Sequence, residues 1–332
     1  MQSTDCLPSF LQPLPDFNPS LPGSYINSFY PATELLGPVH VHWWPCRQRK
    51  LSPTRVLVFI PGNPGLIEFY PPFLSAIHDK DESGRLAILS HSHLNHAPTL
   101  ALPKYVPSTG VSSALCGLAF QVQNALRIYD AVRSTFDSDI KIILAGHSVG
   151  SWIALQVLKA RPNPVSGIFL LFPTITDIAK TPNGRKLSWA FSSPIPRIAS
   201  GLSRVLWALP FQLLRRLFPA YPLEQVRVLQ SLLRSPTAIY AALTMAHDEM
   251  EHIQQLDQSM LDLYRHQICL YFAETDDWVG EQKEVILNAF KADPGAVRVV
   301  HGHRNIPHAF CINHGEELAA QCHEWLSSGD FS

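Results

Sequence analysis

The chain has 332 residues, of which 46% are hydrophobic, and this is enough apolar material for one large α/β domain or two modest ones. Lys and Arg number 26 against 27 for Asp and Glu, which gives a formal net charge of -1. Because nucleic-acid-binding domains carry a clear excess of basic residues, this balance argues against nucleic acid as a partner.

The six cysteines are scattered along the chain, and no two of them have CxxC spacing. This spacing argues against a zinc ribbon and against a disulfide framework, and it fits a reduced compartment. The cysteines are Cys6, Cys46, Cys116, Cys269, Cys311 and Cys322.

The first 30 residues are polar and rich in proline. Prolines and serines break both helical and strand periodicity here, so we expect a flexible N-terminal arm over residues 1–30, followed by one domain over residues 31–332. The segment lacks the basic start and continuous apolar stretch of a signal peptide, which disfavours secretion. No run reaches the roughly 18 uninterrupted apolar residues of a conventional membrane-spanning helix, so membrane contact would be peripheral.

Strand and helix signals alternate beyond residue 38. This alternation predicts βαβ units and a mostly parallel central sheet flanked by helices, which is an α/β fold. The expected strands cover residues 39–44, 55–60, 86–90, 141–145, 166–172, 267–272 and 297–300. The expected helices cover residues 71–80, 117–134, 152–158, 281–291 and 315–327.

Residues 180–262, approximately, interrupt this alternation with a helical pattern and no β run. The interruption predicts a helical cap inserted between two strands, and Pro210 should kink or split it. Leucines recur on one helical face, and Arg204 and Arg215 lie on the opposite face. This face suits either a cap packed on the domain or an amphipathic element that also enters a lipid surface. The leucines are Leu202, Leu206, Leu209, Leu213 and Leu217.

Residues 146–150 read GHSVG and follow the apolar run at residues 141–145. A GxSxG sequence between a strand and a helix is typical of a nucleophile elbow, in which the serine occupies a strained turn above the sheet. The glycines lack a Cβ and so let the strand and the helix approach closely. Ser148 is therefore the candidate nucleophile.

A serine nucleophile needs a base to take its proton and an acid to orient that base. In α/β hydrolases these residues follow in the order Ser, then Asp or Glu, then His. The favoured acid is Asp276, in the loop after the strand at residues 267–272. Asp277 is the close alternative, because one register shift would exchange the two, and Asp177 is a third candidate beyond the preceding strand.

Three histidines follow the strand at residues 297–300 and compete for the role of base. His308 is favoured because it lies among apolar residues just before the closing helix. It also follows Asp276 by 308 minus 276, or 32, residues, which leaves room for one helix and one strand. His301 and His303 are expected to be polar loop residues.

The tetrahedral intermediate of ester hydrolysis carries a negative oxygen that needs backbone N–H donors already in place. One donor is expected to be the N–H of Val149, immediately after the nucleophile. The sequence PGNPG at residues 61–65 follows the strand at residues 55–60. Because Pro64 has no N–H, we expect Asn63 to supply the second donor.

Two groups of histidines are candidate metal ligands. His91, His93 and His96 have spacings that could bind zinc only if carboxylates converged on them. His247 and His252 are five residues apart and diverge on a helix, unlike the four-residue spacing of HExxH. We expect neither a metal nor another cofactor.

Taken together, these motifs resemble the lipid-droplet-associated serine hydrolase family of α/β hydrolases, over roughly residues 54–326. The residues that carry the resemblance are IPGNPG at 60–65 with Phe69, Tyr70 and Phe73, GHSVG at 146–150, LFPTI at 171–175, TPNG at 181–184, Asp276 before Trp278, and HAF at 308–310.

The resemblance implies an α/β-hydrolase fold and an ester hydrolase of neutral or sterol lipids. It implies a location on lipid droplets and the cytosolic face of the endoplasmic reticulum, with peripheral contact to the lipid surface through apolar parts of the chain. Ser148, Asp276 and His308 match the triad positions of the family.

Two other hypotheses remain open at this point. The chain could be a droplet-surface protein whose hydrolase fold serves mainly as a scaffold with little turnover, although an intact triad disfavours this. It could also be a soluble small-ester hydrolase without membrane contact, in which case deletion of residues 202–218 would leave its cellular distribution unchanged.

Overall fold

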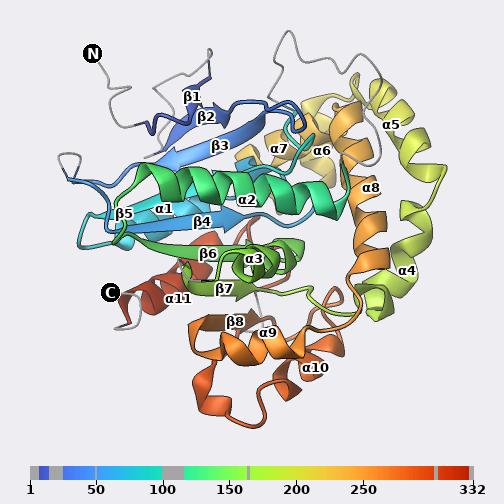
Figure 1. Ribbon diagram of the computed structural model, residues 1–332. Helices are drawn as coiled ribbons and strands as arrows, with labels where there is room; N and C mark the ends of the chain where they lie inside the picture. Colours follow the sequence, from blue (N-terminus) through green and yellow to red (C-terminus); the bar gives the residue numbers. More distant parts are fainter. Residues whose placement is uncertain are drawn as a thin grey trace.

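The computed structural model describes residues 7–14, 25–48, 51–98, 116–162, 165–302 and 306–328. Within them, one sheet has the strand order β1-β2-β3-β5-β4-β6-β7-β8-β9 (Figure 1). The neighbouring strands from β5 through β9 pair in parallel, and β3 pairs antiparallel with β5. The strands are β1 (Gln12–Pro13), β2 (Ile26–Tyr30), β3 (Val39–Trp44), β4 (Arg55–Ile60), β5 (Leu86–His91), β6 (Lys141–His147), β7 (Val165–Leu171), β8 (Ile268–Phe272) and β9 (Arg298–His301).

The central strands are apolar on both faces. In β4, Val56, Val58 and Ile60 point into one hydrophobic core, and Leu57 and Phe59 point into a second core on the other face. Successive side chains of a strand point to opposite faces, so a continuous apolar run is what a sheet covered on both sides requires.

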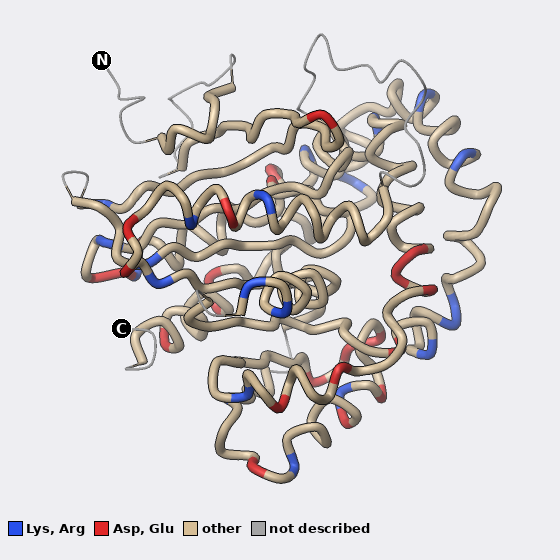
Figure 2. Tube along the Cα trace, viewed as in Figure 1, with Lys and Arg blue, Asp and Glu red and all other residues tan. Residues whose placement is uncertain are grey.

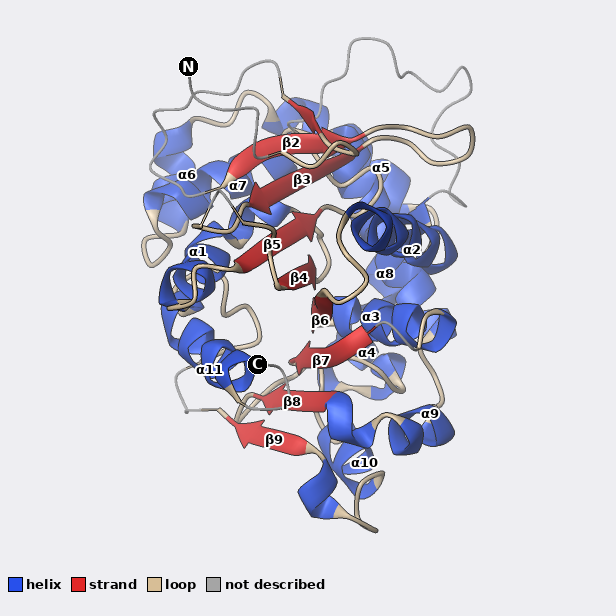
Figure 3. Ribbon diagram, turned by 60° about the vertical axis from the view of Figure 1, so that its left-hand side comes forward, coloured by secondary structure: helices blue, strands red, loops and turns tan. Residues whose placement is uncertain are grey.

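Helices cover the two faces of this sheet (Figure 3). One face is covered by α1 (Pro71–Lys80) and α11 (Gly315–Ser327), which also contact each other. The opposite face is covered by α2 (Leu118–Thr135) and α3 (Val149–Ala160). The mostly parallel sheet flanked by helices confirms the predicted fold class.

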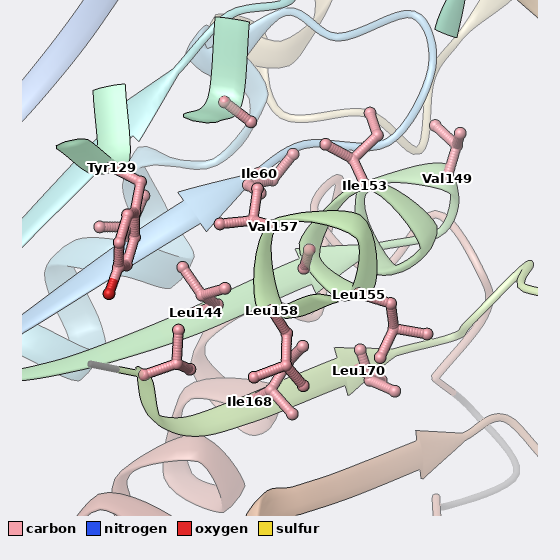
Figure 4. Close-up of a cluster of buried hydrophobic side chains, with 14 of the residues drawn as sticks. Ile60, Tyr129, Leu144, Val149, Ile153, Leu155, Val157, Leu158, Ile168 and Leu170 are labelled. Atoms are coloured by element: carbon pink, nitrogen blue, oxygen red, sulfur yellow. The ribbon is translucent and has the colours of Figure 1, made fainter. Parts of the chain in front are cut away.

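Helix α3 follows β6 and packs across the strands next to it (Figure 4). Its Ile153, Val157 and Leu158 are fully buried in the same core as Leu144 of β6 and Ile168 of β7. This packing holds the start of α3, and with it the turn after β6, in a fixed position.

Six helices lie between β7 and β8, in the segment for which the sequence predicts a cap. The cap helices are α4 (Pro182–Phe191), α5 (Ile195–Leu206), α6 (Phe211–Leu217), α7 (Leu223–Leu233), α8 (Pro236–His252) and α9 (Gln258–Leu263). Helices α4 and α5 pack on α8 and form the right-hand margin of the molecule in Figure 1. None of the helices in the described ranges combines the length and apolarity needed to cross a membrane.

The other described helical elements are short. They are α10 (Gln282–Asn288) and the 3₁₀ turns η2 (Ile67–Phe69), η4 (Ile178–Lys180), η5 (Arg265–Gln267) and η6 (Pro294–Ala296).

The leucine face predicted in the cap is divided between two helices. The helical segment breaks at Pro210, as expected, because α5 ends at Leu206 and α6 begins at Phe211. One side of α5 packs on α8. On that side, the Ser200 hydroxyl donates a 2.8 Å hydrogen bond to the Pro236 carbonyl at the start of α8. The apolar side of α5 is therefore left facing outward.

The N-terminal segment differs from the flexible arm expected over residues 1–30. Where the structure describes it, β1 pairs antiparallel with β2, and β2 pairs antiparallel with β3 at the edge of the sheet. Leu11 is buried in the hydrophobic core. Edge pairing needs only a few backbone hydrogen bonds, which a proline-rich sequence can still supply.

Candidate active site

The turn between β6 and α3 has the geometry of a nucleophile elbow. Ser148 adopts φ 54° and ψ -124°, a strained conformation for a residue with a side chain. A Cβ on Gly146 would lie 2.3 Å from the Gly150 carbonyl oxygen, and a Cβ on Gly150 would lie 2.2 Å from the Ile60 carbonyl oxygen. Both positions therefore require glycine, and the tight turn raises Ser148 above the end of the sheet.

Ser148, His308 and Asp276 lie in one chain of hydrogen bonds. The Nε2 atom of His308 is 2.9 Å from the Ser148 hydroxyl, and its Nδ1 atom is 2.7 Å from an Asp276 carboxylate oxygen. Because a carboxylate accepts, Nδ1 carries the proton and Nε2 accepts from the serine. This is the tautomer in which a histidine can remove the serine proton.

Both oxygens of the Asp276 carboxylate accept hydrogen bonds, which hold the side chain in place. Its side chain is 6% exposed, and its second oxygen accepts hydrogen bonds from the backbone N–H groups of Trp278 at 2.9 Å and Val279 at 3.2 Å. Asp277 is exposed, and its carbonyl accepts from the Asn183 N–H at 2.9 Å. Of the two neighbouring candidates, the structure brings Asp276 to the histidine.

The loop after β4 lies against the elbow. A Cβ on Gly62 would be 3.1 Å from the Ser148 Cβ. The Gly62 N–H donates to the Tyr70 hydroxyl at 3.1 Å, and Pro64 has no N–H. Val149 is buried at the first position of α3, where backbone N–H groups lack helical partners.

The Asn63 side chain joins this loop to the cap. Its Nδ2 group donates 2.9 Å hydrogen bonds to the Ala242 carbonyl and to a carboxylate oxygen of Glu249, both on α8. Glu249 is 4% exposed. Burial, aided by the charge of Asp248, raises the pKa of Glu249 to about 8.

Sequence reasoning missed Glu249, although a signal was present. An acidic residue at position 249 follows Ala242 by seven residues, so it falls on the same face of the predicted helix. A carboxylic acid on the inward face of a helix indicates a specific buried partner.

A family model described as lipid-droplet associated hydrolase matches residues 53–311, which include the elbow, Asp276 and His308. The chain belongs to the lipid-droplet associated hydrolase family. The rat lipid droplet-associated hydrolase is 27% identical over 292 residues, which cover 85% of this chain and 87% of the rat protein. The human protein of the same name is 29% identical over 288 residues, which cover 80% and 83%.

Solved structures of low sequence identity share the fold of this hydrolase family. A putative epoxide hydrolase from Pseudomonas aeruginosa aligns with TM-score 0.62 at 14% identity and covers 94% of this chain and 98% of its own. A haloalkane dehalogenase from Agrobacterium tumefaciens aligns with TM-score 0.61 at 14% identity and covers 92% and 97%. These similarities show the α/β-hydrolase fold.

The other described candidates for the acid and the base, Asp177 and His301, form contacts with other residues. Asp177 forms a 2.9 Å ion pair with Lys180. His301 is exposed at the end of β9, where its ring stacks on Phe272. His303 lies outside the described residues.

Of the candidate metal ligands, His91, His93 and His96 do not form a ligand cluster in the described ranges. His91, His93 and His96 are buried, and burial lowers the pKa of both His91 and His96 to about 4. The His96 ring donates to the Pro64 carbonyl at 2.6 Å and so supports the loop after β4.

One group of described side chains has ligand atoms close enough for a metal, namely Asp248, Glu251 and His252 on α8. It is mostly exposed, and Asp248 already accepts a 2.6 Å hydrogen bond from the Leu118 N–H. The Asp248 contact therefore has a structural role at the junction of α2 and α8.

Proposed function

We propose that this hydrolase is a serine carboxylic-ester hydrolase. Ser148 attacks the ester carbonyl, His308 takes the serine proton and passes it to the leaving alcohol, and Asp276 orients His308. A water molecule, activated by the same histidine, then releases the acid. The observation that carries this proposal is the continuous hydrogen-bond chain from Ser148 through His308 to Asp276, with Ser148 in the strained turn of the elbow.

The N–H groups of Asn63 and Val149 are proposed to hold the oxyanion. In water-poor sites each such donor contributes about 3 kcal/mol to stabilisation of the transition state. The position of Gly62 against Ser148 supports this role, because Asn63 is the next residue of the same loop.

Labelling with a fluorophosphonate probe tests the proposal. The probe should modify Ser148, as located by mass spectrometry of the labelled peptide, and the Ser148→Ala protein should not be labelled. Labelling of the folded Ser148→Ala protein at the same site would contradict the assignment.

The proposed substrate is a neutral or sterol lipid ester presented at a lipid surface. The family name refers to lipid droplets, and the outward side of α5 supports contact with lipid. Ile198, Leu202 and Val205 lie on one side of α5 and are 54%, 59% and 72% exposed. Two further apolar side chains of the cap, Trp207 after α5 and Leu217 on α6, are 68% and 61% exposed.

The charge of the same region fits an anionic headgroup layer. Residues 182–223 contain no acidic residue (Figure 2). The region contains six basic residues, Arg185, Lys186, Arg197, Arg204, Arg215 and Arg216. Basic residues beside exposed apolar side chains favour binding to the negatively charged cytosolic leaflet. We therefore propose a peripheral location on lipid droplets and on the cytosolic face of the endoplasmic reticulum.

A further inference from the structure

A second chain of hydrogen bonds lies next to the proposed triad and connects the loop after β4, the end of β6 and the loop that holds His308. The Gly62 N–H donates to the Tyr70 hydroxyl at 3.1 Å. The Tyr70 hydroxyl lies 2.8 Å from Nδ1 of His147. Nε2 of His147 lies 2.9 Å from the backbone carbonyl oxygen of His308. The chain thus joins the loop after β4, the residue before the nucleophile and the loop that holds the proposed base.

The groups at the two ends of this chain, the Gly62 N–H and the His308 carbonyl, determine which atom donates and which accepts in each hydrogen bond. The His308 carbonyl can only accept, so Nε2 of His147 carries the proton. The Gly62 N–H can only donate, so the Tyr70 oxygen accepts from it and donates its own proton to Nδ1 of His147. All donors and acceptors are then satisfied by a neutral His147 ring.

Burial keeps His147 in this neutral form. Burial holds the pKa of His147 well below its usual value, and the neighbouring His308 lowers it further. The two rings have centroids 5.2 Å apart. A neutral His147 does not repel the charge that His308 must carry during ester hydrolysis.

Aromatic packing isolates the chain from water. Tyr70 and His147 are 4% and 5% exposed. The Phe310 ring lies edge-on to both of them, and the Phe172 ring lies edge-on to His147. A lost partner in this chain would therefore leave a buried polar group unsatisfied.

We propose that Tyr70 and His147 are positioning residues that hold the oxyanion loop and the His308 backbone in register with Ser148. Gly62 precedes the proposed donor Asn63, so a fixed Gly62 N–H fixes the position of that donor. The bond to the His308 carbonyl fixes the main chain from which the proposed base extends. This inference rests on the proposed serine hydrolase function.

The test uses Tyr70→Phe, which removes only the hydroxyl, and His147→Phe, which removes both the donor toward the His308 carbonyl and the acceptor that faces Tyr70. The matched control is Tyr129→Phe. Tyr129 is another buried tyrosine, and its hydroxyl has no hydrogen-bond partner in the described residues. Each variant is compared with the wild type for the rate of fluorophosphonate labelling of Ser148 as a function of probe concentration.

Tyr70→Phe is expected to lower the maximal labelling rate by about 10- to 100-fold, because mispositioning acts on the reaction step. The probe concentration for half-maximal rate should stay unchanged, and Tyr129→Phe should react like the wild type. The double variant should be no slower than the slower single variant, since both changes break one chain.

A wild-type labelling rate in Tyr70→Phe would overturn the inference. A double variant whose loss of rate equals the product of the two single losses would also overturn it. If Tyr70→Phe does not fold, His147→Phe alone decides, and an unchanged rate in that variant overturns the inference. Failure of the proposed function looks different, because the wild-type protein would then show no labelling that depends on Ser148.

Discussion

Glu249 on the cap helix α8 accepts a hydrogen bond from the side chain of Asn63, in the loop whose backbone is proposed to hold the oxyanion. The two residues are separated by 186 positions in the sequence. The carboxyl group is buried, so its protonation state affects both the stability of the fold and the junction between cap and sheet domain.

Glu249→Gln should change how stability depends on pH. Burial raises the pKa of Glu249 to about 8 from a usual value of 4.5, so between these pH values the folded protein holds one more proton than the unfolded chain. For this group, the free energy of unfolding therefore falls as pH rises through that window, by up to about 1.4 kcal/mol per pH unit. Glutamine keeps an acceptor for Asn63 and should remove this decline.

Urea unfolding at several pH values between 5 and 8 measures the effect. Glu251→Gln is the matched control, because Glu251 lies on the same helix with its side chain 58% exposed, and it should behave like the wild type. A wild-type pH dependence in Glu249→Gln would show that the carboxyl group is ionised throughout.

Asp276→Asn should lower ester turnover by about 10⁴-fold, because the amide would favour the wrong tautomer of His308. Asp277→Asn is the matched control. Its side chain is exposed and its carbonyl, which accepts from Asn183, is retained, so its kcat/KM should remain close to wild type. Equal losses in the two variants, measured on one ester, would contradict the choice of Asp276.

Gly150→Ala should destabilise the fold by about 1–3 kcal/mol or disrupt the elbow, because the new Cβ would lie 2.2 Å from the Ile60 carbonyl oxygen. Gly201→Ala in α5 is the control, since no atom lies within 4 Å of the added Cβ. That change should raise stability by about 0.5–1 kcal/mol. Chemical unfolding measures both, and equal effects would contradict the close approach of the strand and helix.

Substitution of the outward side of α5 should weaken lipid binding. The combined change Ile198→Ser, Leu202→Ser and Val205→Ser removes apolar area that is already exposed in the free protein, so flotation with emulsified lipid should fall while the fold persists. Leu263→Ser is the control, because Leu263 is 71% exposed on α9, in a different cap helix. Unchanged flotation of the triple variant would contradict contact through α5.

The main elements, and the residues that form the hydrogen-bond chain of the proposed triad, could be predicted from the sequence, because they depend on local patterns. Strands β3 and β4 have the predicted bounds, and GHSVG fixes the elbow through the order of five adjacent residues. The structure brings the predicted Ser148, Asp276 and His308 within hydrogen-bond distance.

The contacts that support the site could not be predicted in the same way. Tyr70 and His147 are 77 residues apart, and no local spacing links them, since their contact depends on how the loop after β4 meets the elbow. The direction of α5 depends similarly on its contact with α8. A leucine pattern indicates an apolar face but not whether that face points inward or outward.

The most direct test is hydrolysis of lipid esters presented as emulsions. The wild-type and Ser148→Ala proteins are compared under conditions in which both are folded. We predict that the wild type releases free fatty acid and that Ser148→Ala lowers the rate by at least about 10³-fold. Fatty acid release by the folded Ser148→Ala protein at the wild-type rate would contradict the central claim.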